Sequence, residues 1–178
     1  MLKKWEVLIR EAERIQAKCI VEIGCCPFPL DAPLAECYGL STLKLGQWAM
    51  ENNAVLYSCD INPDSVANAQ KIVQDNKIHG VMLECLDGAE YLNRFPQQID
   101  LLYLDNGGPD VTLEQFKIAE NRMSPKGVII LDDAHTDSDG LFSKGTTTIP
   151  YAISQDYDIQ LLPAYGSIMA IIKRKEVQ

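Results

Sequence analysis

The chain lacks the long apolar runs and the excess of basic charge that mark two large classes of protein. No run approaches the roughly 18 consecutive apolar residues of a membrane-spanning helix, and charged side chains near the N-terminus interrupt any signal-peptide core. The 178 residues carry 25 acidic against 16 basic side chains, a formal net charge of -9. An acidic surface repels phosphate backbones. The sequence therefore predicts neither a membrane protein nor a nucleic-acid-binding protein.

The chain holds only two histidines. It also lacks the cysteine spacing of zinc sites and the glycine-rich turn of NAD-binding proteins. The six cysteines include no Cys-x-x-Cys pair, which disfavours a zinc site. Without a secretory signal they indicate reduced thiols in a cytoplasmic protein. Gly24 is followed by cysteines and Pro27 rather than by Gly-x-Gly-x-x-Gly, which disfavours an NAD-dependent oxidoreductase. The cysteines that lie in or beside apolar runs are expected to be core residues: Cys19, Cys59 and Cys85.

Apolar residues make up 47% of the chain and charged residues 23%, the balance of an ordinary globular protein. Apolar periodicity predicts an alternation of helices and strands. Helices are expected over 2–17, 39–53, from Pro63 behind the cap Asn62, over about 88–94, and where Leu113, Phe116, Ala119 and Met123 recur before Pro125-Lys126-Gly127. Strands are expected over 19–23, 54–59, 81–85, 99–104, 128–131, 157–162 and 166–173, with residues 136–152 left as loop.

This alternation predicts the fold class. Five strand–helix units imply right-handed crossovers and a mostly parallel sheet with helices on both faces. The turn at 163–166 closes an antiparallel hairpin. We expect an α/β, Rossmann-like three-layer sandwich with a seven-stranded sheet. No repeat, low-complexity tract or linker divides the chain, so residues 1–178 are expected to form a single domain.

Acidic side chains follow four successive strands at the points where they end. They are Asp60, Asp87, Asp105 and the pair Asp132 and Asp133, while Glu22 and Gly24 mark the end of the first strand. Each alone is explained by a turn or a helix cap. Together they would converge on the crevice at the carboxyl ends of the strands, where ligands bind in such sheets. Asp60 is placed to accept hydrogen bonds from a ribose, and Asp87 from an adenine amine.

Five segments in order resemble the motifs of the class I S-adenosylmethionine-dependent methyltransferases, closest to small-molecule O-methyltransferases that use a divalent cation. They are Val21-Glu22-Ile23-Gly24, Cys59-Asp60-Ile61-Asn62-Pro63, Leu86-Asp87-Gly88-Ala89, Ile99-Asp100-Leu101-Leu102-Tyr103-Leu104-Asp105 and Gly127-Val128-Ile129-Ile130-Leu131-Asp132-Asp133. The resemblance covers about residues 18–173. It implies S-adenosylmethionine as cofactor, bound by Glu22, Gly24, Ser41, Asp60, Ile61, Asp87, Gly88, Ala89 and Asp105.

The first motif departs from the family pattern. Gly39-Leu40-Ser41-Thr42 resembles its second half, but fourteen residues separate Gly24 from Gly39. We interpret residues 25–38 as an insertion in the cofactor loop. It would either fold over the crevice as a lid or displace the methionine end of the cofactor.

The resemblance also implies a Mg²⁺ site made by Asp105, Asp132 and Asp133, which would lower the pKa of an acceptor hydroxyl. In the resembling enzymes the last ligand is often Asn. His135, together with Asp105, is a candidate catalytic residue, with loop packing as the alternative for the histidine. Lys144 is a second candidate base, for which a solvated loop lysine is the favoured interpretation.

The function predicted from the sequence is methyl transfer to a hydroxyl of a small molecule. The alternative is a non-catalytic, methyltransferase-like binding module that uses the 25–38 loop on a partner protein. The closing hairpin also offers a surface for a homodimer.

Overall fold

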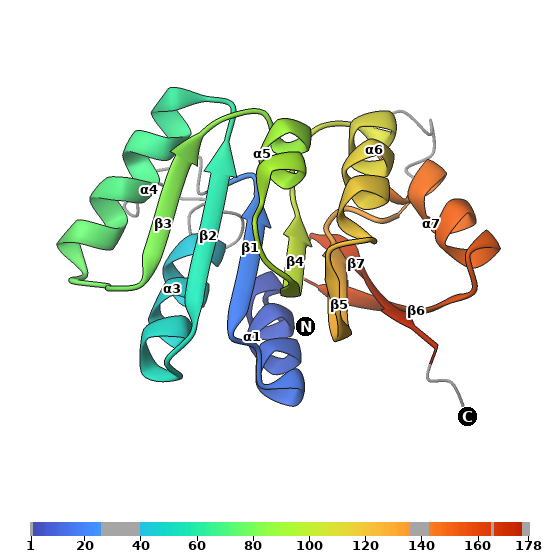
Figure 1. Ribbon diagram of the computed structural model, residues 1–178, viewed down its shortest axis with the longest axis horizontal. Coiled ribbons are helices and arrows are strands. Elements are labelled where there is room, and N and C mark those ends of the chain that lie inside the picture. Colours follow the sequence, from blue (N-terminus) through green and yellow to red (C-terminus); the bar gives the residue numbers. More distant parts are fainter. Residues whose placement is uncertain (1, 26–39, 136–142, 165, 176–178) are drawn as a thin grey trace.

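The computed structural model describes residues 2–25, 40–135, 143–164 and 166–175, in which helices and strands alternate (Figure 1). The helices are α1 (Lys4–Ile15), α3 (Ser41–Glu51), α4 (Pro63–Asp75), α5 (Gly88–Arg94), α6 (Pro109–Ala119) and α7 (Gly145–Ser154). The strands are β1 (Cys19–Ile23), β2 (Val55–Asp60), β3 (Val81–Cys85), β4 (Ile99–Leu104), β5 (Met123–Leu131), β6 (Tyr157–Ala164) and β7 (Ser167–Arg174). The predicted insertion, apart from Cys25, lies outside the described residues.

The seven strands form one sheet in the order β3-β2-β1-β4-β5-β7-β6. Strands β1 to β5 run parallel, and β7 joins β5 and β6 in antiparallel pairs. This confirms the predicted α/β sandwich with a C-terminal antiparallel hairpin. The strand order reverses at the neighbours β1 and β4, which is where a ligand crevice forms in open α/β sheets.

Both faces of the central strands are buried, because a helix layer covers each face (Figure 1). Ile20 packs with Leu8 of α1 and Leu45 of α3 in one apolar cluster. Its neighbour Val21 points to the opposite face and packs in a second cluster with Leu92 of α5. Strand side chains alternate between faces, so consecutive apolar residues are what a sheet covered on both sides requires.

The predicted boundary between α6 and β5 is wrong. The apolar spacing predicts Met123 on the helix, but it lies in β5 and pairs with Ile99. The next pair is Leu101 with Val128, so the ladder is interrupted between the two pairs. Pro125 lies in this bulge, where its missing N–H costs no ladder hydrogen bond. A proline that ends helices in most contexts is therefore accommodated inside a strand.

Helix α7 lies in a segment for which the sequence predicts a loop. Its sequence holds three threonines and Pro150, which have low helix propensity. Tertiary packing offsets this, because Ala152 is fully buried and the Tyr151 ring packs edge-on against Phe116 of α6 at 6.0 Å. The helix depends on its neighbours, so local sequence signals do not reveal it.

The edge strand β3 explains one further error. Cys19 and Cys59 are buried, as expected, whereas Cys85 at the end of β3 is exposed. β3 has a strand neighbour on one side only, and its residues are exposed or half-buried. The sheet ends at β6 on the other side, and the homodimer predicted for that hairpin stays a prediction. Among the described residues, no helix is long and apolar enough to cross a membrane.

Candidate active site

The ends of β1 and β4 approach each other so closely that the residue between them has to be glycine. Gly24 has φ +97°, and a Cβ there would lie 2.5 Å from the carbonyl oxygen of Asp105. The Gly24 N–H donates to the Cys59 carbonyl at 2.8 Å, which joins the turn to β2 as well. Gly24 therefore joins the ends of three strands, directly before Cys25.

Asp60 ends β2 with its carboxylate held by two backbone donors. Its Oδ2 accepts from the Cys25 N–H at 3.2 Å and its Oδ1 from the Asn62 N–H at 2.8 Å. Each carboxylate oxygen has a second lone pair for another donor. The half-buried side chain therefore remains competent to accept hydrogen bonds from a ligand, as the sequence predicts.

Asp87 serves as the N-cap of α5. Its Oδ1 accepts from the N–H groups of Ala89 and Glu90, at 2.9 and 3.1 Å. At the next residue, Gly88, an added Cβ would collide with Cγ2 of Ile23 and with the Gln115 amide. The glycine lets the start of α5 pack directly on the end of β1. Asp87 thus combines the cap role with a place at the crevice.

A cavity of about 540 Å³ lies at these strand ends, within the range of small-molecule sites. Five aspartates and one lysine supply its charged lining. The lining residues are Lys4, Cys25, Asp60, Ile61, Asp87, Gly88, Asp105, Asn106, Gly107, Val111, Asp132 and Asp133. The Oδ1 atom of Asn106 is buried without a hydrogen-bond partner among the described residues. It is an acceptor that a ligand could satisfy.

Four predicted cofactor residues are absent from this described lining: Glu22, Gly24, Ser41 and Ala89. Glu22 is fully buried, and its Oε2 accepts from Thr42 Oγ1 at 2.7 Å and Ser58 Oγ at 2.6 Å. Burial raises the pKa of Glu22, although hydrogen bonds from nearby hydroxyls, including that of Ser41, act to lower it. Glu22 therefore joins β1 to β2 and α3 beneath the crevice.

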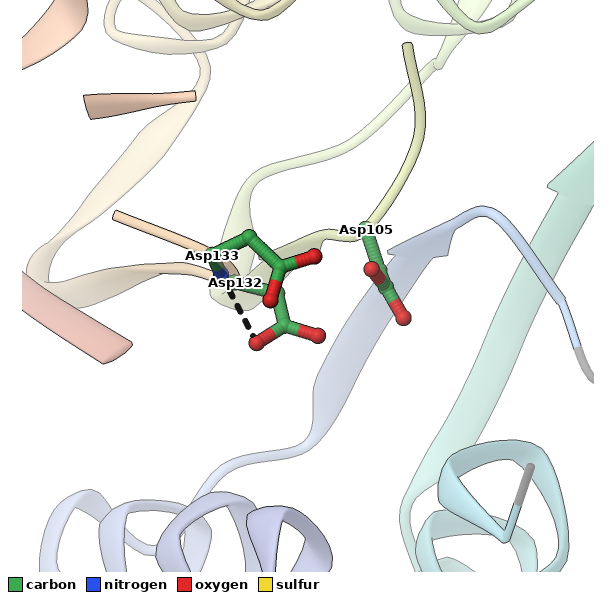
Figure 2. A group of neighbouring side chains, drawn as sticks. All are labelled: Asp105, Asp132 and Asp133. Carbon is green, nitrogen blue, oxygen red and sulfur yellow. Dashed lines mark hydrogen bonds between the residues drawn. The ribbon is translucent and has the colours of Figure 1, made fainter. Parts of the chain in front are cut away.

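Three carboxylates gather where β4 and β5 end, and we call Asp105, Asp132 and Asp133 the acid triad (Figure 2). Ligand-capable oxygens of the three lie within 4.8 Å of one another. Asp132 is fully buried, and its Oδ1 accepts from the Asp133 N–H at 2.8 Å. Asp133 has φ +45°, a left-handed conformation that costs free energy and that its surroundings must impose. The structure thus brings the three predicted residues together.

Two lysines lie against the acid triad. Lys4 Nζ lies 2.6 Å from Asp132 Oδ2 and 3.3 Å from Asp133 Oδ1. Lys144 Nζ lies 2.7 Å from Asp105 Oδ1 and 3.4 Å from Asp133 Oδ2. Lys144 is only 6% exposed, so its interpretation as a solvated loop lysine is wrong.

The pKa values of these groups follow from burial and charge. Burial and the adjacent Asp132 raise the pKa of Asp105 to about 7, although Lys144 and Lys4 oppose the shift. Burial acts to lower the pKa of Lys4 and of Lys144, but the carboxylates outweigh it and both values are raised. Both lysines are therefore charged at neutral pH.

Tyr103 is a further member of the site that sequence reasoning missed. Its hydroxyl lies 3.2 Å from Asp105 Oδ2 and 3.1 Å from Asp132 Oδ2, and burial raises its pKa well above the usual value. A phenol has one proton, so it donates to one carboxylate at a time. Residues two apart on a strand share a face, so its place two residues before Asp105 is a signal that could have identified it.

The structure does not bring His135 to the crevice lining. It lines a different cavity, together with Gly145, Ile149 and Pro150. Its Nδ1 is buried and has no partner among the described residues. Its role as a base thus stays a prediction without support from a contact to the acid triad.

A sequence model of one family, described as a methyltransferase domain, matches residues 36–134, more than half of the chain. No curated protein matches the chain. Among solved structures, the SAH-bound methyltransferase PaMTH1 of Podospora anserina has a TM-score of 0.74 at 17% identity, over 97% of this chain and 78% of that one. A Staphylococcus aureus protein described as a caffeoyl-CoA O-methyltransferase has a TM-score of 0.72 at 14% identity, over 95% and 82%. A Clostridium thermocellum protein described as an rRNA methylase has a TM-score of 0.74 at 13% identity, over 99% and 98%.

Proposed function

The chain belongs to the methyltransferase domain family, among the class I S-adenosylmethionine-dependent enzymes, and from this premise we propose that it methylates a hydroxyl oxygen of a small molecule. The cavity beside the acid triad is the observation that carries the proposal. Bound S-adenosylmethionine supplies a methyl group on a sulfonium centre. The chain's own residues have to hold that cofactor, align the acceptor oxygen and take its proton.

The lining fits the cofactor. Asp60 offers acceptor lone pairs to ribose hydroxyls from a carboxylate already fixed by two backbone donors. Gly88 lines the cavity beside Asp87, and Asn106 offers a buried acceptor that has no partner among the described residues. The lining supports binding by Asp60, Ile61, Asp87, Gly88 and Asp105 of the predicted set.

The charge of the lining supports a small acceptor over a nucleic acid. Five carboxylates and one lysine line the described cavity, and a phosphate backbone would be repelled there. Asp105 faces this cavity and is held by Lys144. It is the residue that we expect to accept the hydroxyl proton.

A divalent cation has no part in the proposed reaction. The resemblance implies one at the acid triad, but Lys4 and Lys144 already make ion pairs with all three carboxylates. The donor set present therefore does not fit a dication unless these ion pairs break, and the predicted Mg²⁺ site stays a prediction.

The test combines calorimetry with a transfer assay. We expect S-adenosylmethionine to bind the wild-type protein, and Asp60→Asn to weaken binding by about 10- to 100-fold through loss of charge-assisted hydrogen bonds. Asp64→Asn is the matched control, because Asp64 is exposed on α4 outside the cavity lining. Failure of the wild type to bind millimolar cofactor would exclude the proposal.

The acceptor class is tested with methyl-labelled cofactor and mixtures of small phenols, catechols and hydroxy acids. Label should appear in an alkali-stable methyl ether, and Asp105→Asn should lower kcat by about 100-fold or more. Transfer to RNA or to amines alone would contradict the proposed acceptor. Cofactor binding without transfer to any of these acceptors would favour the alternative of a non-catalytic module.

A further inference from the structure

Each of the six oxygens of the acid triad is already paired with a donor of this chain. For Asp105, Lys144 Nζ lies 2.7 Å from Oδ1 and the Tyr103 hydroxyl 3.2 Å from Oδ2. For Asp132, the Asp133 N–H lies 2.8 Å and the Ser167 hydroxyl 3.3 Å from Oδ1, and Lys4 Nζ lies 2.6 Å and the Tyr103 hydroxyl 3.1 Å from Oδ2. For Asp133, Lys4 Nζ lies 3.3 Å from Oδ1 and Lys144 Nζ 3.4 Å from Oδ2.

The two ammonium groups bridge the carboxylates in the manner of shared cations. Lys4 bridges Asp132 and Asp133, and Lys144 bridges Asp105 and Asp133. A Mg²⁺ ion shared by the acid triad would need oxygens of the same carboxylates at about 2.0–2.1 Å in near-octahedral geometry. Such an ion would compete directly with both lysines.

Charge makes that competition unfavourable. When all three carboxylates are ionised, as ligands of a metal ion must be, they carry -3 against +2 from the two ammonium groups, and the cluster has a net charge of -1. A dication would change this to +1 and place three cationic centres in contact. Lys4 and Lys144 are 7% and 6% exposed, so they could not regain full hydration after losing their partners.

We propose that Lys4 and Lys144 supply the positive charge for which the resembling enzymes use a divalent cation, and that this protein works without a metal. Lys4 lines the same cavity as Asp60 and Asp105. Its ammonium is therefore the cationic group that meets the acceptor oxygen, while Lys144 holds Asp105 in place. The catalytic part of this proposal rests on the proposed function; its metal-binding part does not.

The first experiment titrates the wild-type protein with Mn²⁺ and follows free Mn²⁺ by electron paramagnetic resonance. Mn²⁺ prefers the same oxygen ligands as Mg²⁺. We expect no saturable binding up to millimolar Mn²⁺. One-site binding to the wild type that is lost in Asp133→Asn would overturn the proposal.

The second experiment removes the lysines. Lys4→Met/Lys144→Met keeps side chains of similar length without their charge, and we expect it to bind Mn²⁺ saturably, with a Kd at least about tenfold below the millimolar limit reached with the wild type. Lys71→Met is the matched control, because Lys71 also pairs with an aspartate, Asp75, but on the exposed face of α4. Circular dichroism checks folding. If the double variant does not fold, the single variant Lys144→Met is titrated in its place. A folded variant that gains no Mn²⁺ affinity would contradict the placement of the lysines at the cation's position.

The third measurement is turnover in a chelator. We expect EDTA and added Mg²⁺ to leave turnover of the wild type unchanged, and loss of turnover in EDTA would overturn metal independence. Mn²⁺ titration needs neither a methyl donor nor an acceptor. Failure of the methyl-transfer proposal would therefore leave the metal-binding result readable, and the two failures are distinguishable.

Discussion

At the scale of single residues, Gly24 is a position where both the backbone conformation and a close contact disfavour a side chain. Its φ of +97° disfavours any side chain, and a Cβ would meet the Asp105 carbonyl oxygen at 2.5 Å. We expect Gly24→Ala to lower the free energy of unfolding by about 1–3 kcal/mol. It should also weaken cofactor binding, because β1 and β4 would move apart at the crevice. Denaturant unfolding and calorimetry measure the two effects.

Gly108 provides the control for this substitution. It is the N-cap of α6, and an added Cβ would meet nothing within 4 Å. We expect Gly108→Ala to lower the free energy of unfolding by about 0.5–1 kcal/mol, because alanine is the poorer cap residue. Equal effects of the two substitutions would show that general loss of glycine flexibility, and not the close approach of β1 and β4, decides the result.

The residues of the site differ in how far sequence could identify them. Asp60, Asp105 and the pair at 132–133 end predictable strands, so the parallel sheet alone brings them together. Lys4 and Lys144 carry no such signal. One lies in the first turn of α1, and the other directly precedes an unpredicted helix. Their approach to the acid triad depends on tertiary packing over 128 and 39 residues of chain separation.

At the scale of elements, Glu11 joins α1 to β7, the strand next to the edge strand β6. This residue is 3% exposed and lies 2.8 Å from Arg14 in its own helix and 3.3 Å from Lys173 on β7. Burial acts to raise the pKa of Glu11, but Arg14 and Lys173 outweigh it, and the pKa is lowered. Since α1 carries Lys4, this contact also helps to position the site.

We expect Glu11→Gln to cost about 1–2 kcal/mol of unfolding free energy at neutral pH, through loss of charge-assisted hydrogen bonds. A lowered pKa in the folded state gives stability that is present above the unfolded pKa and is lost as pH falls through the folded value. The difference between wild type and variant should therefore shrink below about pH 4.5. Urea unfolding across this range measures it, with Glu13→Gln, an exposed site on α1, as control. A difference independent of pH would contradict the charge argument.

Some elements are determined by their local sequence, and others are determined by packing. The strands β1, β3 and β4 have the predicted bounds. In β1 and β4 mostly apolar runs between turn residues suit a sheet that is buried on both faces. Helix α7 and the first residues of β5 were not predicted. In both segments a proline gives a strong local signal, and packing against α6 or pairing with β4 overrides it.

At the scale of the whole molecule, the ligand cavity draws its lining from the ends of β2, β4 and β5, the start of α5, and Lys4 of α1. A cofactor bound there contacts elements that separate on unfolding, so it binds the folded state alone. Linkage then predicts about 2.7 kcal/mol of stabilisation when the ligand concentration is a hundred times Kd. For a chain of 178 residues, this corresponds to a rise in Tm of about 5–11 °C.

We expect S-adenosylhomocysteine to produce this rise in the wild type, measured by scanning calorimetry, and to produce the same rise in EDTA. The comparison in EDTA tests whether cofactor binding depends on a bound metal. If Lys4 and Lys144 balance the charge of the acid triad, the cavity forms without a metal. The rise in Tm on ligand binding is then the same with and without EDTA. If a dication organises the acid triad instead, chelation should lower both the Tm of the free protein and the shift. A smaller shift for Asp60→Asn at the same ligand concentration would locate the binding at the strand ends, since that carboxylate lies on the cavity wall outside the acid triad.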